Sequence, residues 1–162
     1  MKPRSRLFLV LALSFLVSCS GGDPVESARR ALVAGEYGKA VEIASAHLGK
    51  GSKDNPKTRW ALDRIRLEGL AKSKQGDKAS EALEGLATQY PAQVDASLYL
   101  AVGAWARAAG DLAGATRILD TGAKRFPDKA KEFLLAIADI KRSTGEMDAA
   151  TTERLRSLGY LE

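Results

Sequence analysis

Cysteine and histidine are almost absent from this chain of 162 residues, since Cys19 is the single cysteine and His47 the single histidine. One cysteine cannot form a disulfide within the chain. A lone cysteine and a lone histidine also supply too few ligands for a zinc site, and they do not form the Cys/His pair of a nucleophilic enzyme. The sequence therefore predicts a protein with no metal, no cofactor and no catalytic residues.

Aromatic residues are also few, at 6% of the chain, whereas hydrophobic residues as a group reach 45%. Abundant Ala and Leu with few aromatic residues suits helix–helix packing better than a β-sandwich, and no segment shows sustained alternation of polar and apolar residues. The net charge of +5 falls to +2 when Lys2, Arg4 and Arg6 of the amino-terminal segment are set aside (25 − 3 − 20). So small a balance gives no electrostatic case for nucleic-acid binding.

A repeated spacing of glycines organises the rest of the chain. Gly76, Gly110 and Gly145 are 34 and 35 residues apart, and an acidic residue follows each of them. Gly35 precedes Gly76 by 41 residues, and the excess falls in the turn-rich segment 49–57, which predicts a loop. A period of about 34 residues predicts repeated pairs of helices. The expected helices cover residues 25–34, 37–48, 58–74, 78–90, 97–109, 112 to the closing Pro127, 131–143 and 147–158.

The third unit resembles the tetratricopeptide repeat, and the resemblance is carried by Tyr99, Gly103, the Gly110-Asp111 turn, Ala115 and Pro127. It implies an all-α fold in which helix–turn–helix units stack as a short right-handed α-solenoid of about four units, covering residues 24–48, 58–91, 96–127 and 131–162. Small residues let two helix backbones approach closely, so Ala115 is expected to pack against Gly103. In the second unit we expect Gly69 to correspond to Gly103, and Ala82 rather than Glu81 to face inward.

The first residues are typical of an export signal. A basic start is followed by an apolar run over residues 7–17, which is too short for an ordinary membrane span. Residues 16–19, Leu-Val-Ser-Cys, resemble the lipobox of bacterial lipoproteins, which implies a signal peptide at 1–18, acylation of Cys19 and a short tether at 19–23. The resemblance implies a lipid anchor, with the serine after Cys19 favouring the outer membrane and a domain that faces the periplasm. The alternative is an ordinary signal peptide that contains a chance cysteine.

The resemblance to tetratricopeptide repeats also implies a binding groove, because the first helix of each unit lines the concave side in that family. The residues that it places there are Arg66, Leu70, Lys74, Leu100, Ala104, Arg107, Leu135, Asp139 and Arg142. Arg107 and Arg142 lie 35 residues apart and would form a basic ladder. Cations near the end of a helix are also favoured by its dipole, so the ladder has a second explanation that involves no partner.

These patterns together predict a lipid-anchored scaffold of the bacterial envelope, which holds a segment of another envelope protein in its groove. Its setting would be outer-membrane assembly, or the export of proteins, pili or polysaccharide. Two alternatives stay open, namely a structural lipoprotein without a groove partner and a carrier of a small ligand.

Overall fold

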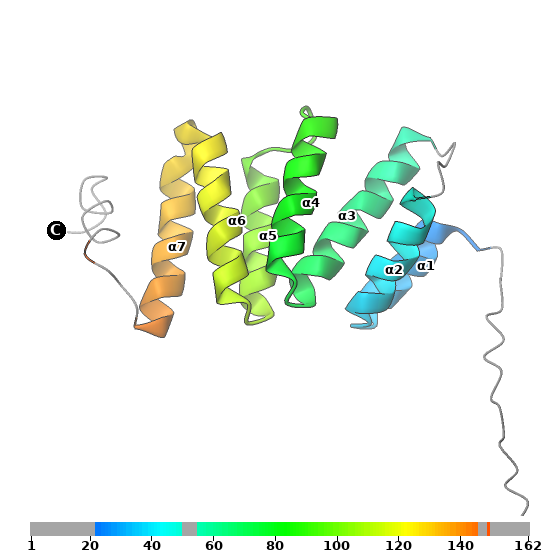
Figure 1. The fold of residues 1–162 in the computed structure, drawn as a ribbon, viewed down its shortest axis with the longest axis horizontal. Helices are drawn as coiled ribbons and strands as arrows, with labels where there is room; N and C mark the ends of the chain where they lie inside the picture. Colours follow the sequence, from blue (N-terminus) through cyan, green and yellow to red (C-terminus); the bar gives the residue numbers. More distant parts are fainter. Residues whose placement is uncertain (1–21, 50–54, 146–148, 150–162) are drawn as a thin grey trace, which may run out of the picture.

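The computed structural model describes residues 22–49, 55–145 and 149. Within this part of the chain there are seven α-helices and one short 3-10 helix, and there is no strand (Figure 1). The all-α prediction is confirmed, and the helix ends lie within two residues of those expected. The elements are α1 (Pro24–Val33), α2 (Tyr37–Leu48), α3 (Pro56–Lys72), α4 (Gly76–Gln89), α5 (Ala96–Ala108), α6 (Leu112–Arg125), η1 (Pro127–Lys129) and α7 (Ala130–Thr144). The helix expected at 147–158 lies outside the described residues.

Short polar side chains start several of these helices. Asp23 accepts a hydrogen bond from the backbone N–H of Val25 at 2.9 Å, and Asp95 accepts one from Leu98 at 3.0 Å. Asn55 accepts bonds from the two backbone amides of Lys57 and Thr58, at 2.8 and 3.0 Å. Each oxygen satisfies donors that the first helical turn leaves unpaired, so these residues fix where α1, α3 and α5 begin.

The helices run side by side, each packing on its neighbours in sequence, and several also pack on helices further along the chain (Figure 1). Helix α3 contacts both α1 and α5, and α4 packs along α6. The apolar core has two parts. A small one is shared by α1, α2 and the first half of α3, and a larger one extends from the second half of α3 to α7, with Tyr99 and Phe133 among its largest buried side chains.

The turn of the second helix pair differs from the sequence prediction. Gly35, Gly110 and Gly145 lie at turns as expected and have positive φ, but in the second pair the positive φ belongs to Lys74, at 59°, and Gly76 is already the first residue of α4. The register of this pair is therefore shifted by two residues. Five residues after each turn position stand Ala40, Ala79 and Ala115, all fully buried. In α4 the residue at this position is Ala79. Ala82 also packs against the core, half-buried, while Glu81 is exposed, as expected.

Two glycine contacts also differ from expectation. A Cβ atom on Gly103 would meet the side chain of Leu119 first, at 2.7 Å, so Leu119 rather than Ala115 is its nearest neighbour. A Cβ on Gly69 would meet Val41 of α2 at 2.7 Å. Gly103 thus permits the close approach of α6 within its own pair, whereas Gly69 permits the close approach of α2 from the preceding pair. The two glycines are not equivalent.

Candidate binding site

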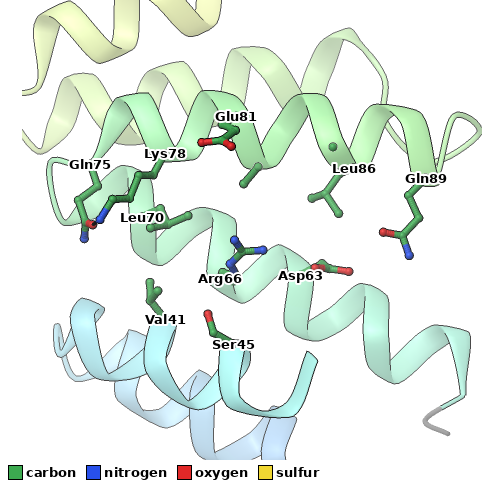
Figure 2. Close-up of a pocket in the computed structure, with 12 residues that line it drawn as sticks. Val41, Ser45, Asp63, Arg66, Leu70, Gln75, Lys78, Glu81, Leu86 and Gln89 are labelled. Atoms are coloured by element: carbon green, nitrogen blue, oxygen red, sulfur yellow. Dashed lines mark hydrogen bonds between the residues drawn. The ribbon is translucent and has the colours of Figure 1, made fainter. Parts of the chain in front are cut away.

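A hollow of about 570 Å³ lies between α2, α3 and α4 (Figure 2). We call it the α3 trough, because α3 forms its floor and the other two helices form its walls. Figure 2 shows Gln75 and Lys78 at one end, Arg66 in the middle, and Asp63 with Gln89 at the other end. The lining residues are Val41, Ser45, Asp63, Arg66, Leu70, Gln75, Lys78, Glu81, Ala82, Gly85, Leu86 and Gln89.

The trough combines an apolar floor with polar walls. Leu70 and Leu86 are buried, and Val41 and Ala82 are half-buried beside them. Lys78, Glu81 and Gln89 are exposed along α4. A concave surface with an apolar base and a few polar groups is the usual form of a binding site in a protein.

Asp63 is the buried charge of this site. Asp63 is only 7% exposed to solvent, and it is the one buried charged residue in the described part of the chain. The Tyr90 hydroxyl donates a hydrogen bond to its Oδ2 at 3.4 Å, and no ion pair joins Asp63 to any described lysine or arginine. Burial raises the pKa of the Asp63 carboxyl, and the charge of Arg66 together with the bond from Tyr90 offsets only part of that rise.

A small aromatic group supports the Asp63 end of the trough. The rings of Trp60 and Tyr90 meet edge to face with their centroids 5.2 Å apart, and the guanidinium of Arg64 lies 5.9 Å from the Trp60 ring. Nearby on the same helix, the Nε of Arg59 is buried without a hydrogen-bond partner. Tyr90 is thus held in place by packing while its hydroxyl contacts Asp63.

A second, smaller hollow of about 70 Å³ lies between α5, α6 and α7. It contains three of the predicted groove residues, Leu100, Ala104 and Arg107. Arg107 forms an ion pair with Asp139 of α7, and Arg142 lies 3.8 Å from the same carboxylate. Leu135, which is 38% exposed, stands one helical turn before Asp139. Because residues four and seven apart share a helix face, these six side chains lie on one surface, which we call the α5–α7 face.

The three groove residues expected from the second pair lie elsewhere. Arg66 and Leu70 line the α3 trough, and Leu70 is part of the buried core. Lys74 is exposed at the turn, where it lines a third hollow together with Asp111. The structure therefore does not bring the nine predicted residues together. The reason is that the predicted positions were counted from Gly76, whereas the turn lies two residues earlier at Lys74, and residues two apart lie on different sides of a helix.

Several residues of the trough were not predicted from the sequence. In the sequence, the acidic and polar residues of α4, such as Glu81 and Gln89, look like the solvent-exposed side of an ordinary helix. The burial of Asp63 could have been predicted from the sequence. Asp63 lies four residues before Leu67 and seven before Leu70, and it therefore shares their apolar helix face. An acidic residue on such a face predicts either a buried partner or a binding site.

Searches with this chain against protein-family models, curated proteins and solved structures found no match. Within the described residues, no group of three His, Cys, Asp or Glu side chains could hold a metal ion. No described helix is long and apolar enough to cross a membrane. Cys19 and the rest of the expected signal segment lie outside the described residues.

Proposed function

We propose that this chain is a lipid-anchored binding scaffold of the bacterial envelope, built as a short right-handed solenoid of tetratricopeptide-like helix pairs. It holds a segment of another envelope protein on the α5–α7 face. The partner belongs to outer-membrane assembly or to the export of proteins, pili or polysaccharide. The proposal gives the chain no catalytic activity and no cofactor.

The recurrence of turn geometry supports the repeat assignment. Positive φ recurs at Gly35, Lys74, Gly110 and Gly145, with intervals of 39, 36 and 35 residues. Seven residues before each turn stand Ala28, Leu67, Gly103 and Ala138, which are all buried. A fixed relation between turn and core positions is what a chain of similar helix pairs requires, since each pair must bury the same face against its neighbours.

The observation that carries the partner assignment is the composition of the α5–α7 face. Two arginines there share the single carboxylate of Asp139, which leaves one positive charge in excess beside an apolar hollow. Leu135 is one of only two large hydrophobic side chains that the described residues expose. An apolar hollow and an exposed leucine beside unbalanced arginines suit a partner segment with an apolar side chain and a nearby carboxylate.

The lipid anchor is supported by the residues around Cys19 alone. An apolar run that ends in Leu-Val-Ser-Cys is typical of a lipoprotein signal, and a lipid on Cys19 would block the one thiol of the chain. Labelling of cells with a fatty-acid analogue tests this part of the proposal. We expect label on the wild-type protein and none on Cys19→Ser, and equal labelling of both would contradict the anchor.

Site-specific photo-cross-linking tests the α5–α7 face. Benzoylphenylalanine is placed at Ala104, which is exposed on this face, and in a matched variant at Ala46, which is exposed on α2. We expect the Ala104 variant to form a discrete adduct in native membranes and the Ala46 variant to form none. Combining Arg107→Glu with Arg142→Glu should remove the adduct. Both arginines are exposed, and surface substitutions of this kind change stability by no more than about 1 kcal/mol.

Two results of this experiment would contradict the proposal. Adducts of the same pattern at Ala104 and Ala46 would show that the cross-linking is not specific to this face. An adduct that survives the double charge reversal would show that the arginines only offset the helix dipole, as in the alternative explanation of the basic ladder.

A further inference from the structure

We propose that the α3 trough is a second docking site, which receives an amphipathic helix of another protein and pairs a lysine or arginine of that helix with Asp63. The site is formed by residues other than those of the α5–α7 face. It therefore stands or falls separately from the proposed function.

The length of the trough suits a helical segment. Its wall on this side is formed by Gln75, which precedes α4, and by Lys78, Ala82, Gly85 and Gln89 of α4, which follow one another at spacings of three and four residues. Fourteen residues separate the first from the last, which at 1.5 Å per residue is about 21 Å of continuous helix surface. An open trough of that length suits a polypeptide segment better than it suits a compact small molecule.

The width of the trough follows from two close contacts on either side of it. Gly69 allows α3 to lie against α2, with the Gly69 Cβ position 3.2 Å from the carbonyl oxygen of Tyr37. Gly76 allows the start of α4 to lie against α6, and its backbone N–H donates to Oδ2 of Asp111 at 2.8 Å. Because α3 is drawn to α2 while α4 is held to α6, the described residues of α2 and α4 make at most marginal contact. The trough occupies the place where those two helices would otherwise pack.

The wall of α4 is low at its centre. A Cβ placed on Gly85 would meet no heavy atom within 4 Å beyond the backbone of its own helix and its two chain neighbours, and Gly85 itself is exposed. Ala82 next to it on the same face is also small. The backbone of an incoming helix could therefore approach α4 at this point as closely as helices do at small-residue crossings.

Charge decides which helix fits. Asp63 is buried, accepts one long hydrogen bond from a neutral hydroxyl, and forms no ion pair with a described residue. Arg59 and Arg66 act on it through space from its own helix, and the net effect of its surroundings still disfavours the charged form. A cationic side chain brought in by an occupant would supply the missing partner. At the opposite end Lys78, which donates to Gln75 Oε1 at 2.9 Å, favours an acidic residue on the same occupant.

The test uses the full chain in lipid nanodiscs and two fluorescent peptides of 14 residues, each held helical by a lactam bridge on its polar face. Both carry leucines at three- and four-residue spacings, and in the terminal turn that would lie at the Asp63 end of the trough one has a lysine where its twin has glutamate. Binding is measured by fluorescence anisotropy, with empty nanodiscs as the blank. We expect the lysine peptide to bind at least about tenfold more tightly than its twin, and Asp63→Asn to remove that difference.

Two matched glycine substitutions locate the binding. Gly85→Trp fills the trough, whereas Gly38→Trp adds the same bulk on α2 at an exposed position whose Cβ also meets nothing within 4 Å. We expect Gly85→Trp to abolish binding of the lysine peptide and Gly38→Trp to leave it unchanged, with both variants keeping the helical circular-dichroism spectrum of the wild type.

Several outcomes would overturn the proposal. These are equal affinity for the two peptides, no binding of either at millimolar concentration, a lysine preference that survives Asp63→Asn, and binding that survives Gly85→Trp. A wild-type dimer in sedimentation that Gly85→Trp dissociates would also overturn it, because the occupant would then be a second copy of this chain.

Discussion

Gly76 and Gly114 bring the first turns of α4 and α6 into backbone contact. A Cβ atom on Gly76 would lie 2.5 Å from the Cα of Gly114, and a Cβ on Gly114 would lie 2.7 Å from the Cα of Gly76. Asp111 spans the contact, since its Oδ2 accepts a hydrogen bond from the Gly76 N–H and its Oδ1 accepts one from the Gly114 N–H. One carboxylate therefore caps two neighbouring helices and holds them together.

Substitution of either glycine should be costly. Gly76→Ala or Gly114→Ala places a methyl group where a neighbouring Cα already lies, so we expect a loss of about 1–3 kcal/mol in the free energy of unfolding. Gly85→Ala, which lies in α4 like Gly76, is the control. Its Cβ meets nothing, and alanine should stabilise the helix by about 0.5–1 kcal/mol. Urea titrations followed by circular dichroism compare the three variants, and similar midpoints for all of them would contradict the contact.

The double cap predicts a distinctive cost for Asp111→Ala. Loss of an ordinary helix cap costs about 1 kcal/mol, and here a second backbone amide, that of Gly76, loses its acceptor as well. Asp95→Ala is the matched control because the Asp95 side chain caps α5 alone. We expect Asp111→Ala to lower the free energy of unfolding by about 1 kcal/mol more than Asp95→Ala does. Equal losses would mean that the bond to Gly76 contributes nothing.

The helices themselves could be predicted from the sequence because the strongest local signals agreed with the fold. Gly35 and Gly110 mark turns where φ is positive, and Asn55 with Pro56 marks the start of α3. At Gly76 the same rule failed. That glycine serves the close contact with Gly114, and a lysine takes the left-handed turn position two residues earlier. A single sequence does not distinguish a glycine needed for its backbone angle from one needed for the space it leaves.

The candidate site was less predictable for a related reason. Its walls come from α2 and α4, and the gap between them depends on where two glycine contacts place α3 and α4. Such a gap is a property of tertiary packing, and no local sequence pattern in α2 or α4 predicts it. The α5–α7 face was easier, because Leu100, Ala104 and Arg107 keep the register of a pair that follows the repeat pattern closely.

The turn at Lys74 predicts that glycine would be better than the natural residue there. A side chain at φ 59° carries a steric cost of about 1–2 kcal/mol that glycine does not have. We expect Lys74→Gly to raise the free energy of unfolding by about 1 kcal/mol. Lys74→Ala removes the same charge but keeps the steric cost, so it should show no such gain. If both variants behave alike in thermal unfolding, the left-handed turn of the second pair does not lie at Lys74.

The raised pKa of Asp63 predicts how stability changes with pH. Below its ordinary value near 3.8 the carboxyl is protonated in both the folded and unfolded states. Between that value and the raised folded pKa, the unfolded chain has lost the proton while the folded protein keeps it, so folding becomes less favourable as the pH rises through this window.

The Asp63→Asn variant has no such titration at this position. The stability of the variant minus that of the wild type should therefore increase from pH 3.5 to pH 7.5 in urea titrations at fixed salt. Tyr90→Phe removes a hydrogen bond that lowers the pKa, and it should extend the fall in stability to higher pH. A difference between Asp63→Asn and the wild type that stays constant or decreases over this range would show that Asp63 is better compensated than its burial indicates.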